Sequence, residues 1–193
     1  MKKFLSILCA GFLLIGSTNA QILKFGLTAG ANINQMKFDE KVVDEKNFNG
    51  FFIGPTLDVK IPVVGLSADA SLLYDHKSVN VNGQDDHIDY IDLPINAKYS
   101  IGLVKLLSVY LATGPQFSFN VGDGKILDKK YDLKSSVFSW NFGAGVKILK
   151  HFQVGYRYNL GISDTAEKAT ISGGIKSIKD KSGTHQLGLT YYF

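Results

Sequence analysis

The side chains of this sequence that could do chemistry are mainly histidines and serines. The four histidines, His76, His87, His151 and His185, fit no H-E-x-x-H frame, and no G-x-S-x-G occurs. Serine catalysis needs a histidine within hydrogen-bond reach, and Ser139 has none at a matching strand position. We therefore expect no enzyme activity, no cofactor and no metal site.

A second candidate is an acidic segment over residues 75–90. It holds His76 and His87 together with Asp75, Asp85, Asp86 and Asp89. Oxygen ligands of this kind could hold a cation. Mixed charges are also typical of a solvated loop, and we favour that interpretation.

The rest of the chain alternates polar and apolar side chains with a period of two, which is typical of β-strands. The alternating segments are 23–33, 51–61, 66–74, 91–101, 109–121, 138–148, 152–160 and 187–193. They are roughly ten residues long, which is the length that a tilted strand needs to cross a bilayer. Their connections alternate between short (62–65, 102–108, 149–151) and long (35–50, 75–90, 122–137, 161–186). This layout is typical of an outer-membrane barrel with both termini on the short-turn side. Within the last long connection, residues 169–178 alternate again and predict a projecting hairpin.

Alternation alone leaves open whether the apolar face points inward, as in a soluble lipocalin-type barrel. The polar face is rich in Gly, Ser, Thr and Asn, which suit a narrow interior, whereas the other carries Phe, Leu, Ile, Val and the one Trp, which suit lipid. We predict an all-β, eight-stranded antiparallel up-and-down transmembrane barrel with its apolar face outward and a polar, filled lumen. Aromatic girdles are expected at both rims: Phe25, Tyr99, Phe152, Tyr191 and Phe193 at one, and Phe51, Tyr74, Phe119, Phe138 and Tyr158 at the other.

Charged residues on the inward face form the main candidate site. They are Lys24, Asp58, Lys60, Asp69, Asp92, Lys98, Lys147 and Arg157. Unpaired charges inside so narrow a barrel are costly, so we expect a paired network that seals the lumen, with an ion path as the alternative. Arg157, the only arginine, is expected to pair with one or more of Asp58, Asp69 and Asp92.

The first twenty residues predict a cleaved signal peptide. Lys2 and Lys3 precede an apolar run from Phe4 to Gly16, and small residues lead to Ala20. The expected domains are the signal peptide 1–20 and a barrel 21–193. The single cysteine, Cys9, leaves with the signal, so no disulfide is expected. No basic stripe indicates nucleic-acid binding.

Several stretches resemble the outer-membrane β-barrel family of Bacteroidota, the PorT-like or "porin family" domain. The matching stretches are YIDLPINAKY (90–99), YLATGP (110–115), FGAGV (142–146), RYNLGI (157–162) and LGLTYYF (187–193). The resemblance implies an outer-membrane protein, with Tyr191 and Phe193 as the signal for the barrel-assembly machinery. The expected partners of the protein are outer-membrane lipid, the barrel-assembly machinery and an extracellular or secretion-system protein. The expected function is structural or loop-mediated binding; the alternatives are a PorT-like accessory in assembly or secretion, a narrow pore or a lipid-modifying enzyme.

Overall fold

The computed structural model describes residues 22–35, 48–61, 65–81, 84–104, 106–122, 125–126, 131–133, 135–149, 151–163, 166–171, 174–176 and 183–193. The predicted signal peptide 1–20 lies outside these ranges. Within them, no helix is long and apolar enough to cross a membrane. The described regular elements are all strands.

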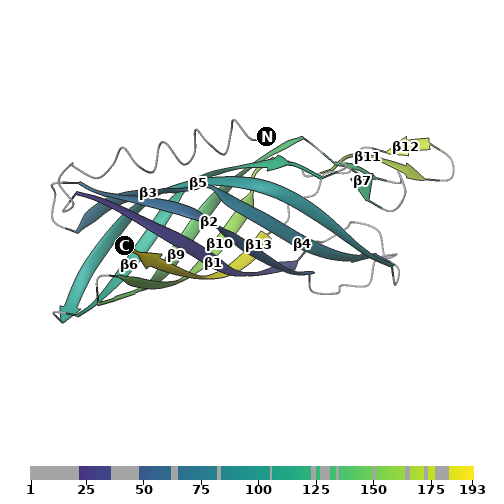
Figure 1. The fold of residues 1–193 in the computed structure, drawn as a ribbon. Helices are drawn as coiled ribbons and strands as arrows, with labels where there is room; N and C mark the ends of the chain where they lie inside the picture. Colours follow the sequence, from purple (N-terminus) through teal and green to yellow (C-terminus); the bar gives the residue numbers. More distant parts are fainter. Residues whose placement is uncertain are drawn as a thin grey trace, which may run out of the picture.

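Eight chain passes form a closed antiparallel ring (Figure 1). The first pass, β1 (Leu23–Gln35), pairs with β2 (Phe48–Lys60) on one side and with the last, β13 (Gly183–Tyr192), on the other. The remaining passes are β3 (Leu66–Ser71) continued by β4 (Leu73–Val81), β5 (Gln84–Val104), β6 (Leu107–Asn120), β9 (Ser136–Ile148) and β10 (Phe152–Gly161). The ring confirms the predicted eight-stranded all-β fold.

The two ends of the ring differ in their connections, as the sequence predicts. Short connections join β2 to β3, β5 to β6 and β9 to β10, and we call this the turn end. Longer segments separate β1 from β2, β6 from β9 and β10 from β13 at the opposite, loop end.

One pass is divided into β3 and β4 at Leu72, opposite Pro55. The Leu72 N–H donates to the Pro55 carbonyl at 3.0 Å, but proline has no N–H to return the bond. The register nevertheless continues, because Thr56 faces Ser71 and Ile53 faces Tyr74. The two segments therefore form a single pass with one interrupted rung.

At the loop end the structure corrects the prediction of a loop over residues 75–90. β4 extends to Val81 and β5 begins at Gln84, so most of this segment is a paired hairpin. Polar residues such as His76 occupy its outward positions. Strands that rise beyond the lipid no longer require apolar residues there, so the membrane-type alternation ends before the strand does.

A second, four-stranded sheet lies beyond the barrel wall at the loop end (Figure 1). Its strands, in the order β12-β11-β8-β7, are β7 (Lys125–Ile126), β8 (Tyr131–Leu133), β11 (Ala166–Ile171) and β12 (Gly174–Lys176). The β11–β12 pairing confirms the hairpin predicted within 169–178. The pairing of β8 with β11, which the sequence did not predict, joins two separate connections in one sheet.

The outward and inward faces confirm the predicted arrangement. Large apolar side chains such as Leu111 and Phe142 are 65% and 51% exposed on the outer face. Aromatic rings cluster near both rims: Phe152 lies 5.1 Å from Tyr191 at the turn end, and Phe51 lies 6.3 Å from Tyr74 toward the loop end. The buried positions are mostly polar, so the polar face fills the lumen.

Two large aromatic side chains fill the lumen where the facing wall carries glycine. A Cβ atom on Gly30 would lie 2.3 Å from Cζ of Phe52, and one on Gly155 would lie 2.1 Å from the Tyr110 hydroxyl oxygen. Neither distance is tolerable for packed atoms. Glycine at these inward positions therefore provides the space that the two rings occupy.

Candidate functional site

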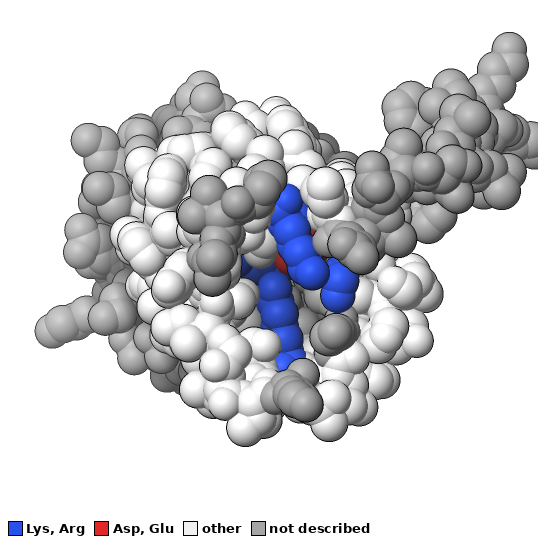
Figure 2. Space-filling model, turned by 90° about the vertical axis from the view of Figure 1, so that its left-hand side faces the viewer, with Lys and Arg blue, Asp and Glu red and all other residues white. Residues whose placement is uncertain are grey.

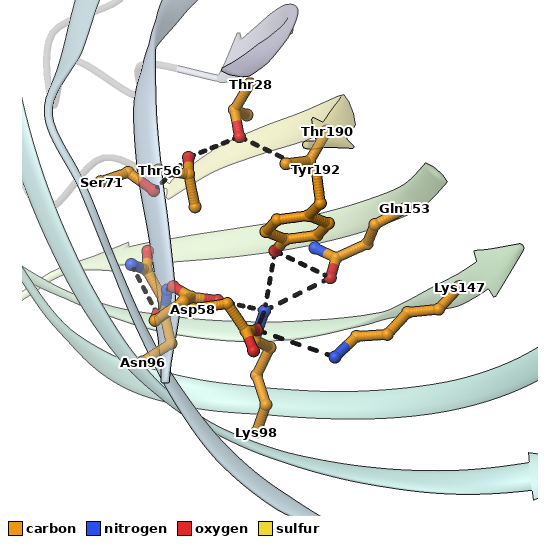
Figure 3. A network of polar contacts seen from close by, with 12 residues as sticks. Thr28, Thr56, Asp58, Ser71, Asn96, Lys98, Lys147, Gln153, Thr190 and Tyr192 are labelled. Carbon is orange, nitrogen blue, oxygen red and sulfur yellow. Dashed lines mark hydrogen bonds and ion pairs between the residues drawn. The ribbon is translucent and has the colours of Figure 1, made fainter. Parts of the chain in front are cut away.

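Lys98 is the centre of the polar cluster in the turn half of the lumen (Figure 3). Its Nζ lies 2.6 Å from Oδ2 of Asp58 and 2.7 Å from Oδ2 of Asp69. All three residues are buried. Two carboxylates on one ammonium satisfy charges that would be costly to bury alone. The structure thus brings together three of the predicted network residues.

Neighbouring side chains complete the surroundings of Lys98. Its ammonium donates to Gln153 Oε1 and to the Tyr192 hydroxyl, both at 3.3 Å. The rings of Tyr110 and Tyr192 lie 5.6 and 5.8 Å from the same nitrogen, within cation–π range. Lys147 approaches the cluster from the turn end, with its Nζ 3.7 Å from Asp58.

A chain of hydroxyl groups crosses four adjacent strands above this cluster (Figure 3). Thr190, Thr28, Thr56 and Ser71 are linked in that order by contacts of 2.8, 2.6 and 2.8 Å. Each hydroxyl can donate and accept once, so the chain satisfies buried groups without adding charge.

A second charged cluster fills the loop half of the lumen. Asp75, wholly buried, lies 3.3 Å from Lys77 and accepts a hydrogen bond from the Asn32 amide. Asp92, also buried, accepts a hydrogen bond of 2.7 Å from Gln116. In this half, therefore, side-chain amides donate hydrogen bonds to the carboxylates in the place of a second cation.

Side-chain amides connect the two clusters. Asn141 donates to Gln116 at 3.2 Å and to Asn96 at 3.3 Å. Asn96 in turn donates to Asp69 at 2.8 Å. The inward network is therefore continuous from Asp92 to Asp69, and its polar groups are mostly satisfied, as buried polar groups generally are.

Arg157 lies on the inner face of the barrel, as predicted, but does not form the predicted ion pair. Arg157 points inward, but among the described residues no carboxylate lies within 4.0 Å of it, and its Nη1 has no hydrogen-bond partner. The prediction that it pairs with Asp58, Asp69 or Asp92 is therefore wrong. Lys98 lies at the level of the first two aspartates instead.

Arg157 lines a cavity of about 40 Å³ between the two clusters, together with Tyr110 and Gln186. The Gln186 side chain is buried, and its Oε1 has no partner. A polar space of this size can hold ordered water.

The remaining predicted residues lie near the turn end. Lys24 is partly buried, with its Nζ 5.9 Å from the centre of the Tyr192 ring. Lys60 is exposed at the end of β2 and does not join the buried cluster. Tyr191 and Phe193 face outward, 41% and 70% exposed.

Asp75 and Lys77 are the charged network residues that the sequence analysis missed. Both fall in the segment predicted as a loop, although their spacing of two residues places them on the same inward face. That alternation, continued from residues 66–74 with charged side chains, is the signal that could have identified them.

The histidines lie outside the lumen. His76 Nδ1 is 2.7 Å from Asp89 Oδ1, and the Tyr74 hydroxyl donates to the same oxygen at 2.9 Å. Asp89 lies two residues before Ile91, where the predicted membrane-spanning segment 91–101 begins, so it is outside that segment. Partial burial opposes its ionisation, but the hydrogen bonds from His76 and Tyr74 outweigh this and lower the pKa of Asp89. Within the described part of the chain, no group of three metal-ligating side chains is placed to hold an ion.

Ser139, the candidate nucleophile, is buried in the wall. Its Oγ accepts a hydrogen bond of 2.7 Å from Asn159. Its inward position separates it from the outward-facing His76, and His151 contacts the Tyr192 carbonyl in a short turn. Among the described side chains, no histidine is in hydrogen-bond contact with this serine.

The barrel is similar to several outer-membrane proteins of known structure. The barrel is similar to Neisserial surface protein A, with a TM-score of 0.50 and 14% identity over 88% of this chain and 97% of that one. OprG of Pseudomonas aeruginosa gives a TM-score of 0.49 and 13% identity over 89% and 94%. The attachment invasion locus protein Ail of Yersinia pestis gives 0.45 and 16% over 88% and 98%.

No curated protein matches this sequence. The family model described as "Outer membrane protein beta-barrel domain" matches residues 6–193. This match covers nearly the whole chain and agrees with the closed ring and its outward apolar belt. The chain therefore belongs to the outer membrane β-barrel domain family and is an outer-membrane barrel protein.

Proposed function

We propose that this protein is a non-catalytic barrel that acts through its loop end, by binding an extracellular or secretion-system protein or as a structural component of the envelope. The pairing of β8 with β11 supports this most directly, because it joins two connections into one sheet outside the wall. A sheet presents a more defined surface than separate loops do, and rigid scaffolds commonly carry binding sites in this way.

The filled lumen supports a sealed barrel rather than a pore. Phe52 and Leu73 are each only 1% exposed, and Lys98 is equally buried. Eight strands leave an interior that side chains can fill. Purified protein in a planar bilayer should therefore show no discrete conductance steps, and reproducible steps would favour the pore.

We also propose a narrower family, a cleaved signal peptide and an assembly signal for this protein. The sequence stretches quoted above support a PorT-like, Bacteroidota member, and the apolar N-terminal segment supports cleavage after Ala20. The outward Tyr191 and Phe193 on the last strand suit recognition by the barrel-assembly machinery. N-terminal sequencing of protein isolated from outer membranes should begin at Gln21.

Removing the loop sheet tests the main proposal. Residues 123–134 and 164–182 are each replaced by a short Gly-Ser linker, which keeps the eight passes, and the variant is returned to a strain that lacks the protein. A binding role predicts that the variant inserts normally but fails to restore the phenotype of the strain. A structural role predicts full restoration of envelope resistance to detergent.

Photo-crosslinking distinguishes an accessory role in assembly or secretion. A photoreactive residue replaces Ile175 in the loop sheet or Val104 at the turn end, where the side chain is 65% exposed. Loop-mediated binding predicts discrete adducts from position 175. Adducts confined to position 104 would instead indicate a partner on the short-turn side, as an assembly or secretion accessory would have, and would contradict the main proposal.

A further inference from the structure

The lumen carries unequal charge at its two ends. Among the described residues, the turn half holds four lysines and two aspartates, and the loop half holds one lysine and two aspartates. The turn-half residues are Lys24, Lys60, Lys98, Lys147, Asp58 and Asp69; the loop-half residues are Lys77, Asp75 and Asp92. The turn half thus has a cationic excess of two charges.

Both aspartates of the turn half are already occupied. Asp58 and Asp69 lie 2.6 and 2.7 Å from Lys98, so Lys147, at 3.7 Å from Asp58, shares a carboxylate that is already paired. Lys60 is exposed, and no carboxylate of the described residues lies within ion-pair distance of it. The excess positive charge is therefore carried by the lysines nearest the opening.

Figure 2 shows this end of the barrel. Basic side chains, drawn in blue, extend across the mouth, and little Asp or Glu is visible between them. Behind them the lumen is closed by buried residues: Tyr192 is 3% exposed, Tyr110 is 7% and Lys98 is 1%. The mouth is thus a basic cup whose floor is closed by these side chains.

The wall of the cup also holds an unused hydrogen-bond donor. Ser67 faces inward, with Lys60 opposite it on β2 and Lys98 opposite it on β5. The residue is 4% exposed, and its Oγ has no hydrogen-bond partner. Buried hydroxyls are normally paired, so this one points to a group that the protein alone does not supply.

We propose that the mouth at the turn end is a binding site for a phosphate-class oxyanion, held by the ammonium groups of Lys24, Lys60 and Lys147 with a hydrogen bond from Ser67. Lysine binds phosphate as a flexible point charge. A small multivalent anion suits a cup with a closed floor better than a polymer does. Short turns of outer-membrane barrels face the periplasm, so the ligand is a free phosphate of that compartment or the phosphate of a lipid headgroup. This site is separate from the proposed loop-end function.

The test is a titration of the whole barrel in nanodiscs of zwitterionic lipid with pyrophosphate at low ionic strength, followed by amide chemical shifts. We expect saturable shifts at the turn ends of β2 and β9, around Lys60 and Lys147. The double variant Lys60→Gln/Lys147→Gln should bind at least tenfold more weakly. The matched control Lys125→Gln/Lys176→Gln, at the loop end, should bind like the unaltered protein. Added salt should weaken binding, because it screens exposed charges.

A second arm separates the two phosphate sources. Nanodiscs containing phosphatidylglycerol should reproduce the shifts and compete with pyrophosphate if the site takes a headgroup, and should do neither if it takes free phosphate. If the double variant fails to refold, Lys60→Gln alone, at an exposed position, should weaken binding at least threefold.

Three results would overturn the proposal. They are shifts that are absent or confined to the loop end, equal affinity in the lysine variants, and binding of polyglutamate without any response to pyrophosphate. The last would indicate an acidic protein partner.

Discussion

The two halves of the lumen hold their buried aspartates by different means. In the turn half, two carboxylates face one ammonium, that of Lys98, at 2.6 and 2.7 Å. In the loop half, Asp75 and Asp92 accept hydrogen bonds from side-chain amides, and the single cation, Lys77, lies 3.3 Å from Asp75. Ion pairing concentrates the stabilisation in one residue, whereas amide hydrogen bonds distribute it over several.

This difference affects how each half tolerates change. Removing one member of a buried ion pair leaves an uncompensated charge, which costs far more than losing a neutral hydrogen bond. The turn half should therefore depend mainly on Lys98, because Lys147 approaches only Asp58 and at a longer distance. Single substitutions in the loop half should each cost less stability, because Lys77 is still 19% exposed to solvent.

Lys98→Met should have the largest effect, because it leaves Asp69 buried without a cation and leaves Asp58 only the longer contact with Lys147, at 3.7 Å. We expect a loss of about 3–5 kcal/mol in the free energy of unfolding, measured by urea denaturation in lipid vesicles. Adding Asp58→Asn and Asp69→Asn should restore part of the loss. Stability equal to that of the unaltered protein would show that the pairing is not what stabilises this half.

Asp75→Asn should cost less, about 1–3 kcal/mol, as expected for a lost charge-assisted hydrogen bond. Lys77 can turn toward solvent, so it is not left buried without a partner. Lys77→Met in the same background separates the ion pair from the hydrogen bond to Asn32. A loss as large as that of Lys98→Met would remove the distinction between the two halves.

Arg157→Met should change stability by less than about 1 kcal/mol, because the guanidinium has no carboxylate within reach and its Nη1 is already unsatisfied. Arg157→Lys serves as the charge-retaining control. The same urea titration applies. A loss of about 3 kcal/mol or more would mean that the arginine forms an ion pair after all.

The smallest effect should come from Asp89, outside the lumen. Its pKa is lowered in the folded state, so ionised Asp89 stabilises the β4–β5 hairpin above its unfolded pKa. That stability is lost as the pH falls through the lower, folded pKa. Hydrogen-exchange protection factors of the hairpin amides should fall between about pH 5 and pH 3. In Asp89→Asn this dependence should disappear, and its persistence would assign the effect to another group.

Much of the barrel could be predicted from the sequence because lipid imposes a strict alternation. Residues such as Leu111 and Phe142 must be apolar where they face the bilayer, and this made each pass visible. His76 lies outward on a part of its strand that has left the lipid, so no apolar residue is required there. The polar–apolar alternation therefore ends before the strand pairing of the β4–β5 hairpin does.

The sequence could predict which charged residues face the lumen, but not which of them pair with one another. Alternation placed Lys98, Asp58 and Arg157 inside, yet their contacts depend on how far each pass is offset along the barrel axis. That offset is a property of the closed ring and leaves no mark in any single strand. Arg157 has the side chain best suited to bind a carboxylate, but Lys98 is the cation that lies at the axial level of Asp58 and Asp69.

The glycine that faces Tyr110 implies a pattern of linked substitution across related barrels. Because the Tyr110 ring occupies the space where Gly155 would carry a side chain, the two positions share one volume. A relative with a larger residue at position 155 should carry a smaller one at position 110, whereas position 30 should stay glycine, because a Cβ atom there would also lie 2.2 Å from the Leu187 carbonyl oxygen. The sizes of the residues at such paired lumen positions should therefore change together rather than independently.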